Sequence, residues 1–176
     1  MTSIAIEGIH LVDLSSHSDD RGSFTELYRR DWIPGSREMV QGNLSQSRTG
    51  VLRGLHFHRR QADYWVVLDG NVIVGLFDLR AGSPTEGAPA TLRLRGAEPR
   101  GLYIPAGVAH GFAAESDVRL LYLVDEPFDG SDEAGIAWND AGLGISWPRA
   151  NPILSGRDRA NPSLAAALAD PPRYMG

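Results

Sequence analysis

The sequence predicts an all-β fold of the sandwich or barrel type. Short runs of β-favouring residues recur along the chain, and several alternate between apolar and polar residues as half-buried strands do. The 176 residues include 20 glycines and 11 prolines, a density that suits many short strands joined by turns. The expected strands are Ile4–Ile6, Ile9–Leu14, Tyr64–Leu68, Asn71–Leu79, Thr91–Leu94, Gly101–Ile104 and Leu120–Val124.

Turn and cap residues add detail to this pattern. The pair Asp69–Gly70 separates two apolar runs, and Asp-Gly is the strongest short signal for a tight hairpin. One helix is expected near the C-terminus, with Asn161 as its N-cap, Pro162 in its first turn and Ser163–Ala169 as its body. The segment Asp170–Pro172 would end that helix. No repeat or linker divides the chain, so we expect a single domain over residues 1–176.

The composition excludes several chemistries. All 17 basic residues are arginines, and lysine and cysteine are absent. The chain therefore offers no Schiff-base lysine and no thiolate for nucleophilic or zinc chemistry. A net charge of −5 argues against broad binding of nucleic acid or anionic membranes. The N-terminus lacks a signal-peptide pattern and the apolar runs are too short to span a membrane, so we expect a soluble, cytoplasmic protein.

The most informative stretch carries histidines at metal-ligand spacing. His56 and His58 are two residues apart, so on a strand their side chains point to the same face. Asp63 follows five residues later, and His110 lies in a separate segment. Imidazole and carboxylate ligands suit divalent Fe, Mn, Ni, Co or Zn. These residues predict either a metal site or a hydrated, histidine-lined barrel mouth.

This stretch resembles the first motif of the cupins. That motif is a glycine, five residues, His-x-His, a short gap, an acid, six residues and a second glycine. Here Gly50, His56, His58, Asp63 and Gly70 satisfy every gap, with aspartate in place of the usual glutamate. The resemblance implies a cupin-type antiparallel jelly-roll barrel, with a short C-terminal helix added by the helix signals above. A looser match to the second motif is made by Pro105, Gly107 and His110.

A closer resemblance covers nearly the whole chain. The sequence is similar to the dTDP-4-dehydrorhamnose 3,5-epimerase family, whose members are metal-free cupins. The resemblance implies epimerisation at C3, C5 or both of a dTDP-4-keto-6-deoxy sugar, without a cofactor. It also implies a homodimer in which N-terminal strands such as Ile4–Ile6 join the partner's sheet. The matching segments are Asp19–Tyr28, Gln41–Phe57, Phe77–Gly87, Leu102–Phe112, Gly135–Pro148 and Leu154–Asp158.

Three residues match the catalytic positions of that family. The resemblance makes His56 the base that removes a proton next to the ketone, and Asp158 the carboxylate that orients it. Tyr122 matches the acid that returns a proton to the opposite face of the sugar. We expect the surroundings of Tyr122 to lower its pKa for this role.

Further residues match positions that bind the substrate. Arg21 and Arg53 resemble arginines that hold the diphosphate, since guanidinium groups suit phosphate oxygens. Phe24 and Glu26 match positions that meet the thymine base. The remaining candidates for substrate contact are Gln41, Asn43 and His110.

Two departures from the family pattern leave the reaction open. Asp63 stands where the family has a lysine near the reacting sugar, and Phe128 stands where a tyrosine is often found. Three alternatives follow from Asp63. A divalent metal on His56, His58, Asp63 and His110 would supply Lewis acidity; a protonated His58 paired with Asp63 would supply a cation; or the chain performs another reaction on a related sugar nucleotide. A non-catalytic sugar-nucleotide binder is a further alternative.

Overall fold

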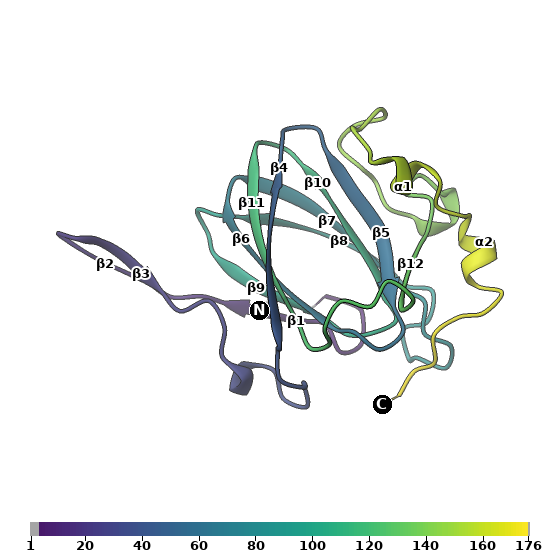
Figure 1. Cartoon of the computed structure of the whole chain (residues 1–176), viewed down its shortest axis with the longest axis horizontal. Coiled ribbons are helices and arrows are strands. Elements are labelled where there is room, and N and C mark those ends of the chain that lie inside the picture. The colour runs from purple at the N-terminus through teal and green to yellow at the C-terminus, as the bar shows by residue number, and fades with distance from the viewer. Residues whose placement is uncertain (1–3, 176) are drawn as a thin grey trace.

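The protein folds as two five-stranded antiparallel sheets that face each other. The computed structural model describes residues 4–175. The first sheet has the order β1-β9-β6-β11-β4, and the second has the order β12-β5-β10-β7-β8 (Figure 1). The first sheet consists of β1 (His10–Asp13), β9 (Arg100–Ile104), β6 (Asp63–Asp69), β11 (Val118–Val124) and β4 (Gln41–Ser47). The second consists of β12 (Glu133–Gly135), β5 (Leu52–His58), β10 (Val108–Ala114), β7 (Asn71–Asp78) and β8 (Pro89–Arg95).

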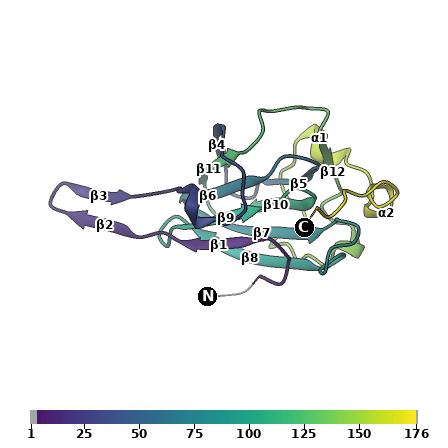
Figure 2. The same cartoon turned by 90° about the horizontal axis from the view of Figure 1, so that it is seen from below.

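The remaining elements lie outside this barrel. A two-stranded hairpin, β2 (Ser16–Asp19) and β3 (Gly22–Thr25), extends away from the body in both views (Figure 1, Figure 2). Two short helices, α1 (Gly156–Arg159) and α2 (Leu164–Ala167), lie beside β5 and β12 (Figure 1). Single 3₁₀ turns occur at Arg30–Trp32 and Ala141–Leu143. No helix in residues 4–175 has the length and apolar character needed to cross a membrane.

Three clusters of apolar side chains explain why the central strands are buried on both faces. The main core fills the space between the sheets and includes Val74, Leu102 and Leu120. A second cluster covers the outer face of β5, β10 and β7 with C-terminal residues, and a third covers the outer face of β6 around Ile33. Burying apolar surface stabilises the fold at roughly 25 cal/mol per Å². The three clusters therefore stabilise both faces of the central strands.

The all-β prediction is confirmed, and six of the seven expected strands are present in β1, β6, β7, β8, β9 and β11. The expected strand Ile4–Ile6 is wrong. The chain turns there: Gly8 has a φ of +76°, and the Ile9 N–H donates to the Ile6 carbonyl at 3.3 Å. Ile6 is instead buried in the protein's own core, so its apolar side chain is removed from water without strand pairing.

The Asp69–Gly70 turn is present, but it does not make a hairpin. β6 pairs with β9 and β11 in the first sheet, whereas β7 pairs with β10 and β8 in the second. The turn is therefore a corner where the chain passes from one sheet to the other. Gly70 has a φ of +79°, and a Cβ there would lie 2.0 Å from the Asp117 carbonyl oxygen, so only glycine fits.

The C-terminal helix is shorter than expected and begins later. Its N-cap is Ser163, whose Oγ accepts from the Ala166 N–H, and α2 ends at Ala167. Asn161 was the expected cap, but its side chain lies against Gly135 instead. Ser163 thus satisfies a free N–H group of the first helical turn, two residues later in the chain than Asn161 was expected to do.

Candidate active site

A cavity of about 360 Å³ opens between the two sheets. Its walls carry side chains from β4, β5, β6, β10, β11 and β12, and Arg157 of α1 completes the rim. We call it the catalytic cavity. Nine of the residues singled out in the sequence line it: Gln41, Asn43, Arg53, His56, His58, Asp63, His110, Tyr122 and Phe128.

A bulge in β5 turns Arg53 and His56 toward the same cavity although they are three residues apart. Between β10 and β5, His110 pairs with His56 and Phe112 pairs with Arg53, so β5 has one more residue than β10 over this stretch. The two strands approach closely here, because a Cβ on Gly111 would lie 2.6 Å from the Arg53 carbonyl oxygen. His58 then returns to the same face as His56 by ordinary alternation.

His56 and Asp158 form a tight pair. The Nε2 of His56 lies 2.6 Å from Oδ1 of Asp158. Asp158 is buried in α1, and the hydroxyl of Ser155 donates to its Oδ2 at 2.9 Å. Burial by itself opposes ionisation of Asp158, but the hydrogen bonds from His56 and Ser155 outweigh it and lower the pKa of this carboxyl. An ionised Asp158 only accepts, so Nε2 carries the proton and Nδ1 is the free basic nitrogen.

A second carboxylate, which the sequence analysis missed, lies beside that free nitrogen. Oε1 of Glu133 is 3.5 Å from Nδ1 of His56. Arg157 donates to the other oxygen of Glu133 at 2.7 Å. Glu133 reaches this place because β12 pairs with β5, where Glu133 lies opposite His58. No local spacing in the sequence signals that long-range pairing.

Tyr122 reaches the catalytic cavity from the facing wall. It lies on β11 in the first sheet, whereas His56 lies on β5 in the second. The expectation of a lowered pKa for Tyr122 is wrong. Burial raises the pKa of Tyr122, the charges of Asp63 and Glu133 raise it further, and Arg53 opposes them only in part. The phenol is therefore held neutral, in the form that donates a proton.

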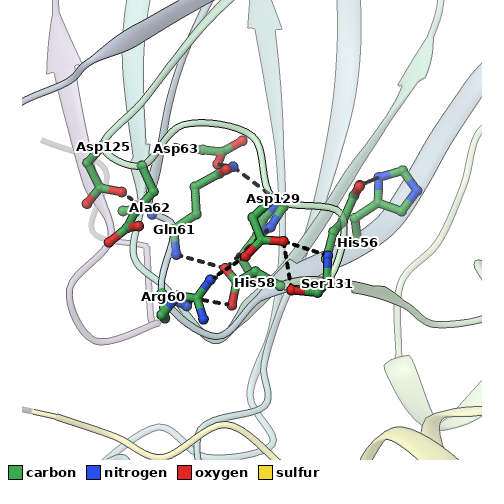
Figure 3. Close-up of polar contacts among 12 residues, drawn as sticks. His56, His58, Arg60, Gln61, Ala62, Asp63, Asp125, Asp129 and Ser131 are labelled. Atoms are coloured by element: carbon green, nitrogen blue, oxygen red, sulfur yellow. Dashed lines mark hydrogen bonds and ion pairs between the residues drawn. The ribbon is translucent and has the colours of Figure 1, made fainter.

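The short turn before β6 is fixed by carboxylates. Asp132 accepts from the backbone N–H groups of Arg60 and Gln61, both at 3.2 Å. Asp125 accepts from the Ala62 N–H at 2.7 Å (Figure 3). Burial raises the pKa of Asp125, with the bond from Ala62 opposing it. These contacts hold the side chain of Gln61 against the residues that follow.

Asp63 is buried and bound by neutral donors. Gln61 Nε2 donates to one of its oxygens at 2.8 Å (Figure 3). The indole N–H of Trp65 donates to the other at 3.0 Å. The nearest imidazole is that of His110, whose Nε2 is 3.6 Å from Asp63 Oδ2. His110 donates from Nδ1 to the Val108 carbonyl. Burial lowers the pKa of His110, and the charge of Asp63 opposes that shift.

The expected pair of His58 with Asp63 is wrong, because Gln61 lies between them. The amide nitrogen of Gln61 contacts His58 Nε2 at 3.2 Å and Asp63 at 2.8 Å. The other ring nitrogen of His58 is buried without a hydrogen bond, and the nearest carboxylate oxygen recorded for it, on Asp132, is 3.9 Å away. The carboxylate of Asp63 therefore faces His110 rather than His58.

The four-residue metal set is also not assembled. One ligand atom from each of His58, Asp63 and His110 lies within 4.8 Å of the others. His56 is outside this group, because Asp158 holds its Nε2 and Glu133 faces its Nδ1. Two imidazoles and a carboxylate are suitable ligands for a divalent transition metal. The three residues are therefore able to hold such an ion without His56.

The residues expected to meet the nucleotide divide into two groups. Arg53 is in the catalytic cavity, where Ser47 accepts from its Nε at 2.9 Å. Arg21 and Phe24 lie on the projecting β2–β3 hairpin (Figure 2). They are outside the cavity of their own chain, and Phe24 is 71% exposed. Glu26 follows the hairpin and pairs with Arg29 at 2.8 Å. Within one chain, the structure does not bring Arg21, Phe24 or Glu26 to the site.

Gln41 and Asn43 meet at the rim of the catalytic cavity. The amide nitrogen of Gln41 donates to Asn43 Oδ1 at 2.9 Å, and the oxygen of Gln41 accepts from the Phe128 N–H at 3.1 Å. The Phe128 ring is 68% exposed at the same rim. These three residues form the entrance on the β4 side.

The fold and this cavity define a class: a cupin-type barrel whose cavity carries a histidine–carboxylate pair on one wall and a tyrosine on the other. A family model described as dTDP-4-dehydrorhamnose 3,5-epimerase matches residues 3–166. The chain belongs to this family.

Known proteins similar to the chain agree with this assignment. A dTDP-4-dehydrorhamnose 3,5-epimerase of Pseudomonas aeruginosa is 38% identical over 174 residues, which cover 94% of this chain and 96% of the relative. The crystal structure of NovW, a 4-keto-6-deoxy sugar epimerase of Streptomyces spheroides, superimposes with a TM-score of 0.91 at 36% identity, covering 98% and 92% of the two chains. ChmJ, a 3'-monoepimerase of Streptomyces bikiniensis solved with dTDP-quinovose, has a TM-score of 0.90 at 32% identity, covering 99% and 94%.

Membership of this family also bears on the cofactor. Enzymes of this family epimerise without one, so these comparisons do not favour the metal-dependent alternative. The ligand-like spacing of His58, Asp63 and His110 is then a property of the cupin scaffold that the reaction does not need.

Proposed function

We propose that this protein epimerises a dTDP-4-keto-6-deoxy sugar at C3, C5 or both, with His56 as the base and Tyr122 as the acid. The observation that carries the proposal is the 2.6 Å contact between His56 Nε2 and Asp158, which leaves Nδ1 as the basic nitrogen in the cavity. A carboxylate that fixes the tautomer in this way also stabilises the imidazolium that forms.

The two walls of the cavity support inversion of a carbon centre. His56 removes the proton next to the ketone, and the electron pair of the broken C–H bond moves into the enolate. Tyr122, on the opposite sheet, donates its phenolic proton to the other face of the same carbon. The raised pKa of Tyr122 keeps the proton on the phenol until the enolate forms.

Substrate binding follows from the polar residues around this pair. We assign the diphosphate to Arg53 and the sugar–phosphate path to Gln41 and Asn43, with His110 as a further contact on the sugar. ChmJ, solved with dTDP-quinovose, supports a dTDP-linked substrate. Because the chain contains no lysine, the enolate oxygen has none to stabilise it, and Asp63 stands at the position where the family has one. Asp63 itself is bound by neutral donors from Gln61 and Trp65.

A homodimer would bring the missing nucleotide contacts to the site. Arg21 and Phe24 were matched to substrate positions, yet they do not line their own catalytic cavity. They lie on the hairpin that extends away from the body of the protein (Figure 1). We propose that this hairpin reaches the catalytic cavity of a second copy. Phe24→Ala should then raise KM for the dTDP-sugar in the dimer. A monomer in sedimentation experiments at full activity would contradict this assembly.

We also propose a single domain and a cytoplasmic location for this enzyme. The chain acts as one domain over residues 1–176, which the shared core between the sheets supports. The protein acts in the cytoplasm, and membership of a family of soluble enzymes supports that location.

The reaction is tested by proton-exchange NMR on dTDP-4-keto-6-deoxyglucose in D₂O. We expect deuterium at C3, C5 or both together with inversion, and strong loss of product in His56→Ala. Full-rate inversion in His56→Ala would overturn the assignment of the base. Binding of the nucleotide sugar without exchange or turnover would instead identify a non-catalytic binder.

A further inference from the structure

Glu133 occupies a position next to the reacting nitrogen that the proposed reaction has not yet used. Its Oε1 is 3.5 Å from Nδ1 of His56, and its side chain is 11% exposed. Nε2 of His56 is committed to Asp158 at 2.6 Å. The nitrogen that takes the substrate proton is therefore the one that faces Glu133.

The Glu133–Arg157 ion pair also separates two hollows in the surface. Both residues line the catalytic cavity, and both line a second, more open groove between β12 and the C-terminal helices. That outer groove is bounded by Phe57, Arg59 and Ala167. Arg157 is about half exposed, so the pair is in contact with solvent on its outer side.

The surrounding elements fix this geometry. β12 is the edge strand of the second sheet, and Glu133 lies opposite His58 of β5. Helix α1 supplies both Asp158, which binds one nitrogen of His56, and Arg157, which binds Glu133 at 2.7 Å. Adjacent residues of one helical turn thus hold the partners of both nitrogens.

Inversion by two groups leaves the enzyme in the wrong protonation state for another turnover. The proton from the substrate C–H bond ends on Nδ1 of His56, and the proton of Tyr122 ends in the new C–H bond on the opposite face. His56 is then an imidazolium and Tyr122 a phenolate. The phenolate takes a proton from water, and the imidazolium has to lose one.

We propose that Glu133 is the proton relay that resets His56. It accepts the Nδ1 proton and releases it to water in the outer groove, on the far side of the Glu133–Arg157 pair from the substrate. This inference rests on the proposed function. A carboxylate can take up and release a proton, whereas a carboxamide cannot. The substitution Glu133→Gln therefore removes the relay while keeping the shape of the side chain.

The test compares wild type, Glu133→Gln and Glu115→Gln during conversion of dTDP-4-keto-6-deoxyglucose in D₂O. Glu115 is the matched control: it also pairs with an arginine, Arg93, at 2.8 Å, but outside the catalytic cavity. NMR follows deuterium in the recovered substrate and in the epimerised product. Melting temperatures of all three proteins report any structural loss.

Wild type and Glu115→Gln should place deuterium in recovered substrate, because the abstracted proton escapes before it returns. In Glu133→Gln the proton stays on His56 and goes back to the carbon it left. The ratio of exchange to epimerisation should therefore fall by about tenfold or more, and Glu133→Asp should restore part of it.

A ratio in Glu133→Gln equal to that of wild type would overturn the relay, whether or not the variant is less stable. A wild type that exchanges and inverts normally while Glu133→Gln keeps its ratio leaves the proposed function intact and removes the relay alone. A wild type that neither exchanges nor inverts any dTDP-4-keto sugar would overturn the proposed function and, with it, the relay.

Discussion

The imidazole of His56 and the carboxylate of Asp158 are joined by a 2.6 Å contact across 102 residues of sequence. Asp158 is held for this contact by the N-terminal turn of α1, where Ser155 both caps the helix and donates to the carboxylate. The orientation of the base thus depends on a four-residue helix that follows the barrel in sequence.

Asp158→Asn should lower kcat by about 100-fold or more, because the amide can donate to Nε2 and favours the wrong imidazole tautomer. KM should change little, since Asp158 does not line the catalytic cavity. Steady-state kinetics on a dTDP-4-keto sugar measure both constants. Asp140→Asn is the control, because Asp140 also caps a short helical turn but lies away from the cavity. Equal losses in the two variants would mean that Asp158 acts only on stability.

Tyr122→Phe should separate exchange from inversion. The variant keeps His56 and Asp158, so proton removal continues, but no phenol remains to protonate the opposite face. Product formation should fall by about 100-fold or more, while deuterium still enters recovered substrate. Proton NMR in D₂O reads both quantities in one experiment. Inversion at the wild-type rate would show that another group, or water, is the acid.

Removal of metal should not change the activity. The protein purified without added metal should hold far less than one divalent ion per chain, and a chelator should leave the epimerisation rate unchanged. Elemental analysis and a rate measurement before and after chelation test this. A stoichiometric metal that is lost in Asp63→Asn or His58→Ala, with loss of activity, would revive the metal-dependent alternative.

Asp78→Asn should destabilise the fold by about 3–5 kcal/mol, because it removes the partner of a buried arginine. Asp78 is fully buried and binds Arg80 through both oxygens at 2.7 and 2.8 Å, as well as Ser83 and Thr85. Burial opposes its ionisation, but these bonds prevail and lower its pKa below the usual 3.8.

The lowered pKa of Asp78 determines how the stability loss in Asp78→Asn depends on pH. A carboxylate with a lowered native pKa stabilises the fold above its unfolded pKa, and this stabilisation is lost as the pH falls through the native value. Urea unfolding at neutral pH and at about pH 3 should show the gap between wild type and Asp78→Asn narrowing in acid. An equal gap at both pH values would mean that ionisation of Asp78 contributes nothing.

Local patterns predicted much of the barrel. Short β-rich runs, several of them alternating, identified β1, β6, β7, β8, β9 and β11, and the His56–His58 spacing correctly placed both rings in one cavity. The same patterns failed where the surroundings decide. Asp69–Gly70 predicted a turn correctly, but whether a tight turn joins paired strands or two sheets depends on strands elsewhere in the chain. Ile4–Ile6 was apolar enough for a strand. In the structure the chain turns at Gly8, and Ile6 packs into the core instead of pairing.

The sequence by itself determined the barrel class, the family and the candidates His56, Asp158 and Tyr122. These depend on residue types and on the order of motifs along the chain, which can be read without a structure. Only the tertiary structure decided three things: that Gln61 separates His58 from Asp63, that His56 lies outside the metal-like group, and that Glu133 faces its free nitrogen. The physical reason is that sheet pairing and helix placement bring together side chains far apart in the chain. Those contacts, and the burial that comes with them, set the charge and hydrogen bonds of each group.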